Sequence, residues 1–312
     1  DEVARAIATR VLLENSDRPA DDPQRLIDLD AATEIAPVQT HGVLQAIQAN
    51  WTWGFFQSNR WRFAQRTIQA QSDSDHELSE ISSWDLRQIV IEIRYRFEMA
   101  LATDAGLKKL LVGDWAMLVE AGSMGEAYRP TLWDVVAQDA IAFHQTGERG
   151  IVAPEDAFEL EASSPALQEV NIFRHWQPVQ KATKKEFVTD TDSPILQIIS
   201  LYQQILNFHA DDTDQTAYLS ADLDRLRWAR EVAVADGETE PNDRFCHELK
   251  TYIEKAEDYE ISAMARFSLG VFGQKAQLKL GASQYRQLIA IRKVSVGSLS
   301  LIHISEPTRL GF

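Results

Sequence analysis

The stretch that decides the fold reads Trp51-Thr52-Trp53-Gly54-Phe55-Phe56-Gln57-Ser58-Asn59-Arg60-Trp61-Arg62-Phe63-Ala64-Gln65-Arg66. It holds three of the eight tryptophans and three of the thirteen phenylalanines, with three arginines among them. Apolar residues recur at steps of three and four up to and through this stretch, at Val43, Leu44, Ile47, Trp51 and Phe55. This spacing predicts one long helix over residues 39–66. A β-strand over residues 51–56 is the weaker alternative, because apolar and polar residues do not alternate there.

The aromatic and arginine residues of this stretch allow two interpretations. Arg60, Arg62 and Arg66 alternate with Trp61 and Phe63, a pattern that would bind single-stranded nucleic acid by stacking. The alternative is core packing, with the arginines stacked on rings or paired with carboxylates. A net charge of −16 repels phosphate backbones, which favours packing and argues against a nucleic-acid partner. On that interpretation Trp61→Ala is expected to cost about 3–5 kcal/mol of stability.

Helical spacing on both sides of this stretch predicts an all-α fold. The hydrophobic content of 45% and charged content of 25% are ordinary for a globular protein, and 312 residues suffice for about two domains. Ser83 or Asp85 is expected to cap one helix and Thr131 another. The predicted helices on either side of the 39–66 helix cover residues 2–14, 23–32, 86–102, 104–112, 114–120 and 131–144. Together they predict an N-terminal helical bundle over residues 1–150, with the Trp- and Arg-rich helix in its core.

The second half of the chain begins with a change of pattern. Residues 151–192 contain three prolines and little periodicity, which predicts a long irregular connector with short helical turns and one short strand. Ser193 and Pro194 then suit the cap and first position of a helix. Further helices are predicted over residues 215–235, 241–256, 259–271 and 275–293. Their short connections predict a helix-pair, tetratricopeptide-like array over residues 193–298, although a full repeat is missing.

The last residues of the chain have a different origin in our interpretation. Residues 299–309, Leu-Ser-Leu-Ile-His-Ile-Ser-Glu-Pro-Thr-Arg, resemble one translated frame of a transposon-end adapter used in sequencing libraries. The alternative is a natural strand over residues 299–304 followed by a turn at Pro307. We expect residues 299–312 to be a non-native tail that makes few contacts, and the remainder to be a fragment of a larger multidomain protein.

Residues that could support metal or acid–base chemistry are scattered along the chain. The cluster closest to a metal site is His209 with Asp211, Asp212 and Asp214. It has no central glycine and no closing glutamate, both of which an EF-hand loop needs, so we expect a solvated helix cap. The seven histidines show no zinc-hydrolase spacing; they are His41, His76, His144, His175, His209, His247 and His303.

The single cysteine, Cys246, is followed directly by His247. Neighbouring residues on a helix point in different directions, so the pair is a poor nucleophile and base, and we expect a partly buried, inert thiol. One cysteine also rules out an intramolecular disulfide and a cysteine-based metal cluster. The chain has no phosphate-binding loop, no Gly-x-Gly-x-x-Gly and no Gly-x-Ser-x-Gly. The prediction is therefore a protein that is not an enzyme, with no catalytic, cofactor-binding or metal-binding residues and no cofactor.

Several short segments follow one another in a distinctive order between residues 51 and 228. They are Asn59-Arg60-Trp61-Arg62-Phe63 with Gln65-Arg66-Thr67, Ser83-Trp84-Asp85-Leu86, Tyr128-Arg129-Pro130-Thr131-Leu132-Trp133-Asp134, Pro154-Glu155-Asp156-Ala157-Phe158-Glu159 and Ala221-Asp222-Leu223-Asp224-Arg225-Leu226. This succession resembles the N-terminal helical region of large, Bacteroidetes-type bacterial alpha-2-macroglobulin-like proteins. The resemblance covers more than half of the chain.

The resemblance implies a secreted or periplasmic protein of the cell envelope, often lipid-anchored, that inhibits endopeptidases by trapping them. Family members contain macroglobulin β-sandwich domains, a bait region and, in many cases, a thioester formed within a Cys-x-Glu-Gln motif. The sequence Cys246-His247-Glu248-Leu249 departs from that motif at its last position. The resemblance thus implies a non-catalytic helical segment without bait region or thioester.

The expected partners follow from the same resemblance. They are proteases, reached through the full-length parent, and other domains of the same chain, with any membrane contact made by a lipid anchor outside residues 1–312. The alternative is a stand-alone helical-repeat module that binds a partner protein in a concave groove.

Overall fold

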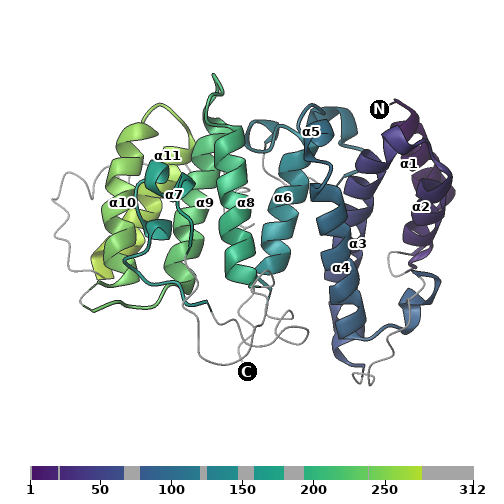
Figure 1. Ribbon diagram of the computed structural model, residues 1–312, viewed down its shortest axis with the longest axis horizontal. Coiled ribbons are helices and arrows are strands. Elements are labelled where there is room, and N and C mark those ends of the chain that lie inside the picture. The colour runs from purple at the N-terminus through teal and green to yellow at the C-terminus, as the bar shows by residue number, and fades with distance from the viewer. Residues whose placement is uncertain are drawn as a thin grey trace. The chain divides into compact units, whose positions relative to one another are not determined.

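The computed structural model describes residues 2–19, 22–66, 78–119, 125–146, 158–178, 193–237 and 239–275. These residues form eleven α-helices and several short 3-10 helices, and their only β-structure is isolated bridges (Figure 1). The predicted all-α fold is confirmed. The predicted helix over residues 275–293 and the predicted tail over residues 299–312 lie, except for Lys275, outside the described residues.

The chain divides into two compact units. The first comprises residues 1–122 and 129–156, and the second comprises residues 123–128 and 157–312. The short 3-10 helix η4 (Glu126–Tyr128) belongs to the second unit because it packs against α9 (Thr216–Val232). The predicted bundle over residues 1–150 would have included it.

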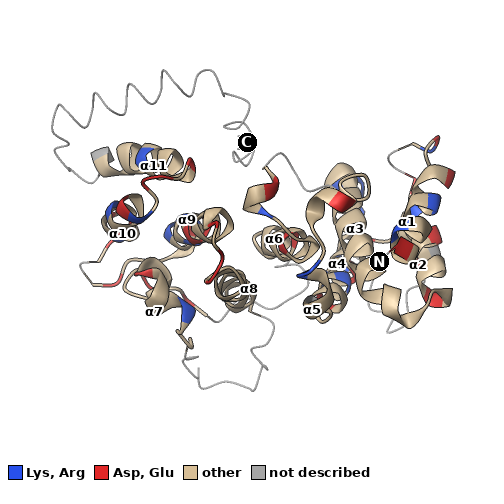
Figure 2. Ribbon diagram, turned by 90° about the horizontal axis from the view of Figure 1, so that it is seen from above, with Lys and Arg blue, Asp and Glu red and all other residues tan. Residues whose placement is uncertain are grey.

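Helix α3 (His41–Ala64) is the centre of the first unit. It lies between α1 (Glu2–Glu14) and α2 (Gln24–Ile35) on one side and α6 (Leu132–His144) on the other, in both ribbon views (Figure 1, Figure 2). It packs most extensively against α4 (Leu86–Leu101). Buried residues surround α3 on all sides from Ala46 to Trp53, which is typical of a helix enclosed by others.

The aromatic side chains of α3 form the core of this unit. Trp53 stacks on Phe56, with ring centroids 5.7 Å apart. It also makes edge contacts with Phe97 of α4 at 6.5 Å and Phe143 of α6 at 5.8 Å. Trp51 donates its indole N–H to the carbonyl of Leu118 at 2.5 Å. Buried aromatic rings stabilise a fold through both their buried area and the geometry of their contacts. These contacts join α3 to α4, to α6 and to the turn that contains Leu118.

Trp61, however, is exposed, and its predicted role as an anchor is wrong. The side chain is 63% exposed, whereas Trp51 and Trp53 are at most 5% exposed. In the last turns of α3 only one face of the helix is buried, and Asn59 and Phe63 are the last buried residues on it. Trp61 is two residues from each of them, about 200° around the helix, and therefore faces away from the core.

The segment before α6 is less helical than its spacing predicts. The predicted helix over residues 104–112 is only one turn, α5 (Asp104–Leu107), and that over residues 114–120 is a short 3-10 helix, η3 (Val112–Trp115), followed by turns. The reason is a pair of long-range backbone bonds. Val112 N–H donates to the carbonyl of Pro130, and Leu132 N–H donates to that of Leu110, both at 2.9 Å. This pairing holds residues 110–112 extended and interrupts the helix.

The described residues of the second unit contain four long helices, each packed against the next. They are α8 (Pro194–Phe208), α9, α10 (Pro241–Lys255) and α11 (Ile261–Lys275). The predicted start of α8 is confirmed: Ser193 Oγ accepts a bond from Leu196 N–H at 3.2 Å, and Pro194 occupies the first helical position. Whether these helices form a true repeat remains a prediction.

Residues 158–178 form part of the core of the second unit, which corrects the prediction of a separate irregular connector. They contain the 3-10 helix η6 (Pro165–Leu167) and the short helix α7 (Val170–Arg174). Leu160, Leu167 and Phe173 are at most 1% exposed. A parallel bridge between Glu161 and Val234 fixes the segment beside the end of α9. Short helical turns and one short strand were predicted here; among the described residues the segment has the turns and an isolated bridge in place of a strand, and its burial was not predicted.

Candidate functional site

Arg66, the last residue of the quoted stretch, ties the end of α3 to the chain before α4. Its guanidinium donates to the carbonyls of Trp84 and Ser82, each at 2.5 Å, and lies 5.7 Å from the ring centroid of Phe63. Phe63 itself is 3% exposed. The alternating residues that suggested nucleic-acid stacking therefore do not form one surface. Phe63 is buried and Arg66 binds backbone carbonyls, whereas Trp61 faces solvent.

Two of the motif segments are helix starts. Asp85 caps α4. Its carboxylate accepts a hydrogen bond from the backbone N–H of Gln88 at 2.9 Å, and the side-chain oxygen of Gln88 accepts one from the backbone N–H of Asp85 at 2.8 Å. Thr131 and Asp134 form the same reciprocal box at the start of α6. Such boxes satisfy backbone N–H groups that a helix cannot pair internally. Of the two caps predicted for α4, Asp85 is the residue used.

The box at the start of α6 leads to a stability prediction. Thr131 is 6% exposed, and its hydroxyl both donates to Asp134 at 2.8 Å and accepts from Asp134 N–H at 3.3 Å. Thr131→Val keeps the shape but removes the hydroxyl, and is expected to lower the free energy of unfolding by about 1–2 kcal/mol. Thr131→Ser keeps the hydroxyl and should lose well under half of that amount in urea unfolding. Equal losses in the two variants would show that the cap contributes nothing.

The motif segment in α9 contains a buried ion pair that clamps distant chain. Arg225 is 1% exposed and donates to the carboxylate of Asp222, which is 6% exposed. Its remaining N–H groups donate to the carbonyls of Ala166 and Gln168, each at 2.9 Å. The guanidinium also lies 4.8 Å from the ring centroid of Phe173. One arginine therefore holds η6 and α7 against α9 through contacts about 55–60 residues away in the chain.

In the predicted histidine and aspartate cluster only the histidine is buried, whereas Asp211, Asp212 and Asp214 are exposed. His209 is 1% exposed, its Nδ1 lies 2.7 Å from the Asp212 carboxylate, and its ring lies 4.4 Å from that of Phe208, so the expectation of a solvated cap is wrong for this residue. Asp214 instead accepts bonds from the hydroxyl and N–H of Thr216, and these bonds lower the pKa of its carboxyl group. Within the described residues, no three His, Cys, Asp or Glu side chains could hold a metal ion together.

Cys246 is more deeply buried than its sequence context predicts. It is 1% exposed, and burial raises the pKa of its thiol, followed by a smaller contribution from the charge of Asp243. A thiol with a raised pKa stays protonated at neutral pH and is a poor nucleophile. The neighbouring His247 is exposed, so the two side chains point apart as the helix geometry requires.

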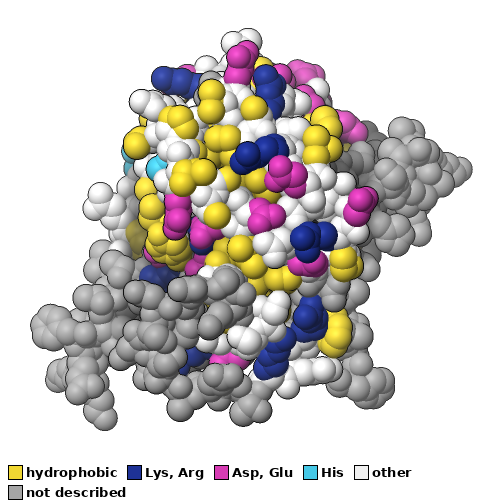
Figure 3. All heavy atoms as spheres, turned by 90° about the vertical axis from the view of Figure 1, so that its right-hand side faces the viewer, with side chains coloured by type: hydrophobic (Ala, Val, Ile, Leu, Met, Phe, Trp, Pro, Cys, Tyr) yellow, Lys and Arg dark blue, Asp and Glu magenta, His cyan; other side chains and the backbone are white. Residues whose placement is uncertain are grey.

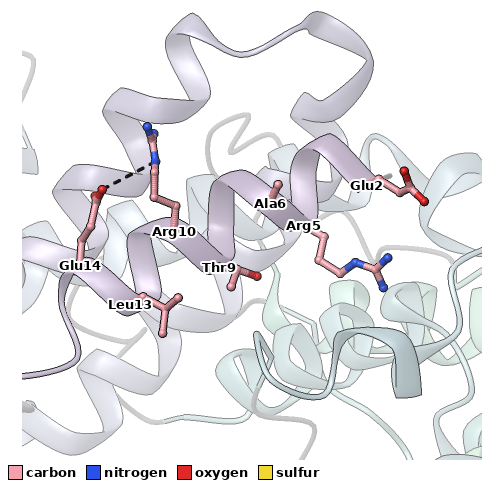
Figure 4. Close-up of a pocket in the computed structure, with 7 residues that line it drawn as sticks. All are labelled: Glu2, Arg5, Ala6, Thr9, Arg10, Leu13 and Glu14. Atoms are coloured by element: carbon pink, nitrogen blue, oxygen red, sulfur yellow. Dashed lines mark ion pairs between the residues drawn. The ribbon is translucent and has the colours of Figure 1, made fainter.

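A shallow hollow lies on the outer face of α1. It measures about 600 Å³ and is lined by residues of that one helix, including Arg10 and Glu14, which form an ion pair at 3.9 Å (Figure 4). Apolar groups and charges of both signs are mixed on the face seen in Figure 3. Ligand sites normally bring polar groups together from several elements. Side chains from a single helix diverge, so this hollow cannot surround a substrate.

A smaller and more polar hollow lies between the α1–α2 turn and α3. It measures about 180 Å³ and is lined in part by Asn15 and by the Arg18–Asp22 ion pair at 2.9 Å. The amide oxygen of Asn15 is buried and has no protein hydrogen-bond partner. The volume suits a few water molecules rather than an organic substrate, because substrate pockets usually exceed about 300 Å³.

Comparisons with known proteins do not add to this picture. No family model, no curated protein and no solved structure matches the chain. No described helix is both long enough and apolar enough to cross a bilayer. The functional argument therefore depends on what the motif residues do in the structure.

Proposed function

We propose that the chain is a non-catalytic helical segment of an alpha-2-macroglobulin-like endopeptidase inhibitor. The observation that supports this proposal is the role of the charged motif residues. Arg66, Asp85, Asp134 and the Asp222–Arg225 pair all bind backbone groups or each other and fix helix starts and clamps. Motif residues that fix helix starts and hold segments of the chain together suit a scaffold that positions other domains.

In this proposal the trapping chemistry belongs to other parts of the parent protein. A thioester requires a cysteine paired with a glutamine, and Cys246 is followed three positions later by Leu249. The burial of the Cys246 thiol and its raised pKa also oppose acyl transfer from it. The proposed partners are proteases, which would meet the parent outside the cell or in the periplasm, and neighbouring domains of the same chain.

The second candidate function is a stand-alone helical interaction module. It is favoured by the row of helices from α8 to α11, in which each helix packs against the next. Arrays of this kind present extended surfaces to partner proteins. Among the described residues the row contains four long helices, and the sequence lacks the full periodicity of a helical repeat. We therefore place this function second.

An entrapment assay separates the two functions. The natural protein that contains this segment should be incubated with a trypsin-like protease, and cleavage of casein and of a small chromogenic peptide should be followed together. Entrapment predicts that casein cleavage falls while peptide cleavage persists, because a caged protease still admits small substrates. Residues 1–312 alone should change neither rate. Unchanged casein cleavage by the natural protein, or inhibition by residues 1–312 alone, would contradict the proposal.

A further inference from the structure

The turn that joins α9 to α10 contains the single Asp-Gly pair of the chain, Asp236-Gly237, and the chain has no Asn-Gly pair. Gly237 is exposed and has a φ of +60°, which glycine adopts without steric cost. Asp236 is half-buried, and its backbone N–H and carbonyl both pair with Thr239, at 3.0 and 2.9 Å. The pair therefore lies in a hydrogen-bonded turn that water reaches.

An aspartate that precedes glycine can react with its own backbone. The nitrogen of Gly237 attacks the side-chain carboxyl carbon of Asp236, a C–N bond forms, and the carboxyl hydroxyl leaves with the proton of the nitrogen as water. Proximity favours this intramolecular attack, and glycine has no side chain to hinder it.

The five-membered succinimide that results takes one water back. Hydrolysis at the former side-chain carbonyl regenerates aspartate. Hydrolysis at the former backbone carbonyl leaves isoaspartate, in which the chain runs through the former side chain. One water leaves and one returns, so the reaction needs no cofactor, oxidant or enzyme.

The side chain of Asp236 also ties the turn to a segment of the core. Ser163 Oγ donates to its carboxylate at 2.5 Å. Close by in the chain, Val234 N–H donates to the carbonyl of Leu160, and the carbonyl of Val234 accepts from Ala162 N–H, both at 2.9 Å. Leu160 and Ala162 are at most 1% exposed. One side-chain bond and two backbone bonds thus hold the turn to this buried segment.

We propose that Asp236 is a site of spontaneous isoaspartate formation, and that the change unties the turn from residues 160–163. In isoaspartate the carboxyl carbon whose oxygen bound Ser163 becomes a peptide carbonyl. The carbonyl that paired with Thr239 becomes a free carboxylate, and one methylene is added to the backbone. The side-chain bond to the segment is therefore lost, while the two backbone bonds of Val234 remain. This proposal does not depend on the proposed function of the chain.

Incubation of the full chain at neutral pH and physiological temperature tests the first part of the proposal. Trypsin then releases residues 231–244, which contain Asp236 and, as an internal control, Asp243. Electron-transfer fragmentation distinguishes the two isomers and should show isoaspartate accumulating with time at position 236 but not at 243, where arginine follows. Asp236→Glu should show none at 236, because glutamate would have to close a larger ring.

A synthetic peptide of residues 231–244 is the reference for the reaction without the fold. Isoaspartate that forms in the peptide but not in the folded chain would overturn the proposal, because the turn would then protect the pair. Its absence from both, or equal amounts at positions 236 and 243 of the folded chain, would also overturn it.

Peptide-resolved amide exchange tests the second part. Residues 160–163 should exchange faster in incubated protein than in fresh protein, in proportion to the isoaspartate content, while residues 44–56 of the first unit stay unchanged. Ser163→Ala removes the same side-chain bond without altering the backbone, and should show a rise over residues 160–163 without incubation. Isoaspartate at position 236 with unchanged exchange over residues 160–163 would contradict the untying of the turn.

Discussion

Replacement of Arg225 by methionine is expected to destabilise the second unit by about 3–5 kcal/mol, because it leaves the buried carboxylate of Asp222 without its cation. The carbonyls of Ala166 and Gln168 lose their donors at the same time. The Phe173 ring loses the guanidinium that lies against it. Urea unfolding followed by circular dichroism measures the loss, and peptide-resolved amide exchange assigns it to the second unit.

The neighbouring Arg227 provides the matched control. Its side chain is 31% exposed and lies 3.7 Å from Asp224, so Arg227→Met is expected to cost less than about 1 kcal/mol. Adding Asp222→Asn to Arg225→Met should recover part of the loss, since the double variant no longer buries an uncompensated charge. A cost for Arg225→Met no larger than that for Arg227→Met would show that the clamp does not hold η6 and α7.

The second large effect is expected for Trp53→Ala, at about 3–5 kcal/mol. Trp53 is 5% exposed and touches rings from three helices, so its removal leaves a cavity between α3, α4 and α6. Trp61→Ala, in the same helix and with the same change of side chain, should cost less than about 1 kcal/mol because the ring is already in solvent. Urea unfolding of the two variants in parallel measures the difference.

Similar losses in the two tryptophan variants would contradict this description of α3. A large loss for Trp61→Ala would restore the sequence-based expectation that its ring is an anchor. A small loss for Trp53→Ala would show that the rings around it repack without cost. Circular dichroism of each variant before unfolding serves as the control for a native starting state.

Local spacing was sufficient to predict most of the helices. The helix predicted over residues 39–66 is α3, His41–Ala64, and that over residues 86–102 is α4, Leu86–Leu101. Both have an apolar repeat of three and four residues that continues for several turns. The caps at Asp85, Thr131 and Ser193 were also predictable, because capping depends on a side chain within three residues of the N–H that it binds.

Contacts between residues distant in the chain explain the errors. The burial of residues 158–178 depends on Arg225, whose acceptors at Ala166 and Gln168 carry no sequence signal because they are backbone carbonyls. The exposure of Trp61 depends on where the helices around α3 end, and helical periodicity contains no such information. The sequence of α9 did contain a partial signal, since Asp222 and Arg225 are three residues apart among leucines of the buried face.

The candidate site was predictable to a similar extent. The inert character of Cys246 follows from the geometry of neighbouring residues on a helix, and the structure adds complete burial. The burial of His209 could not be predicted, because an acidic loop after a helix usually faces solvent. The structure also assigns roles to Arg66 and Asp134 that motif matching alone did not give.

Amide hydrogen exchange on the unmodified chain tests most directly the central claim, that the aromatic stretch is core and that its motif residues hold the fold. The slowest amides of the first unit should lie between residues 44 and 56, the part of α3 in which most side chains are buried. Protection should decline toward residue 64, where only one stripe of the helix remains buried. Exchange over residues 44–56 as fast as that of the outer helix α1 would contradict the claim.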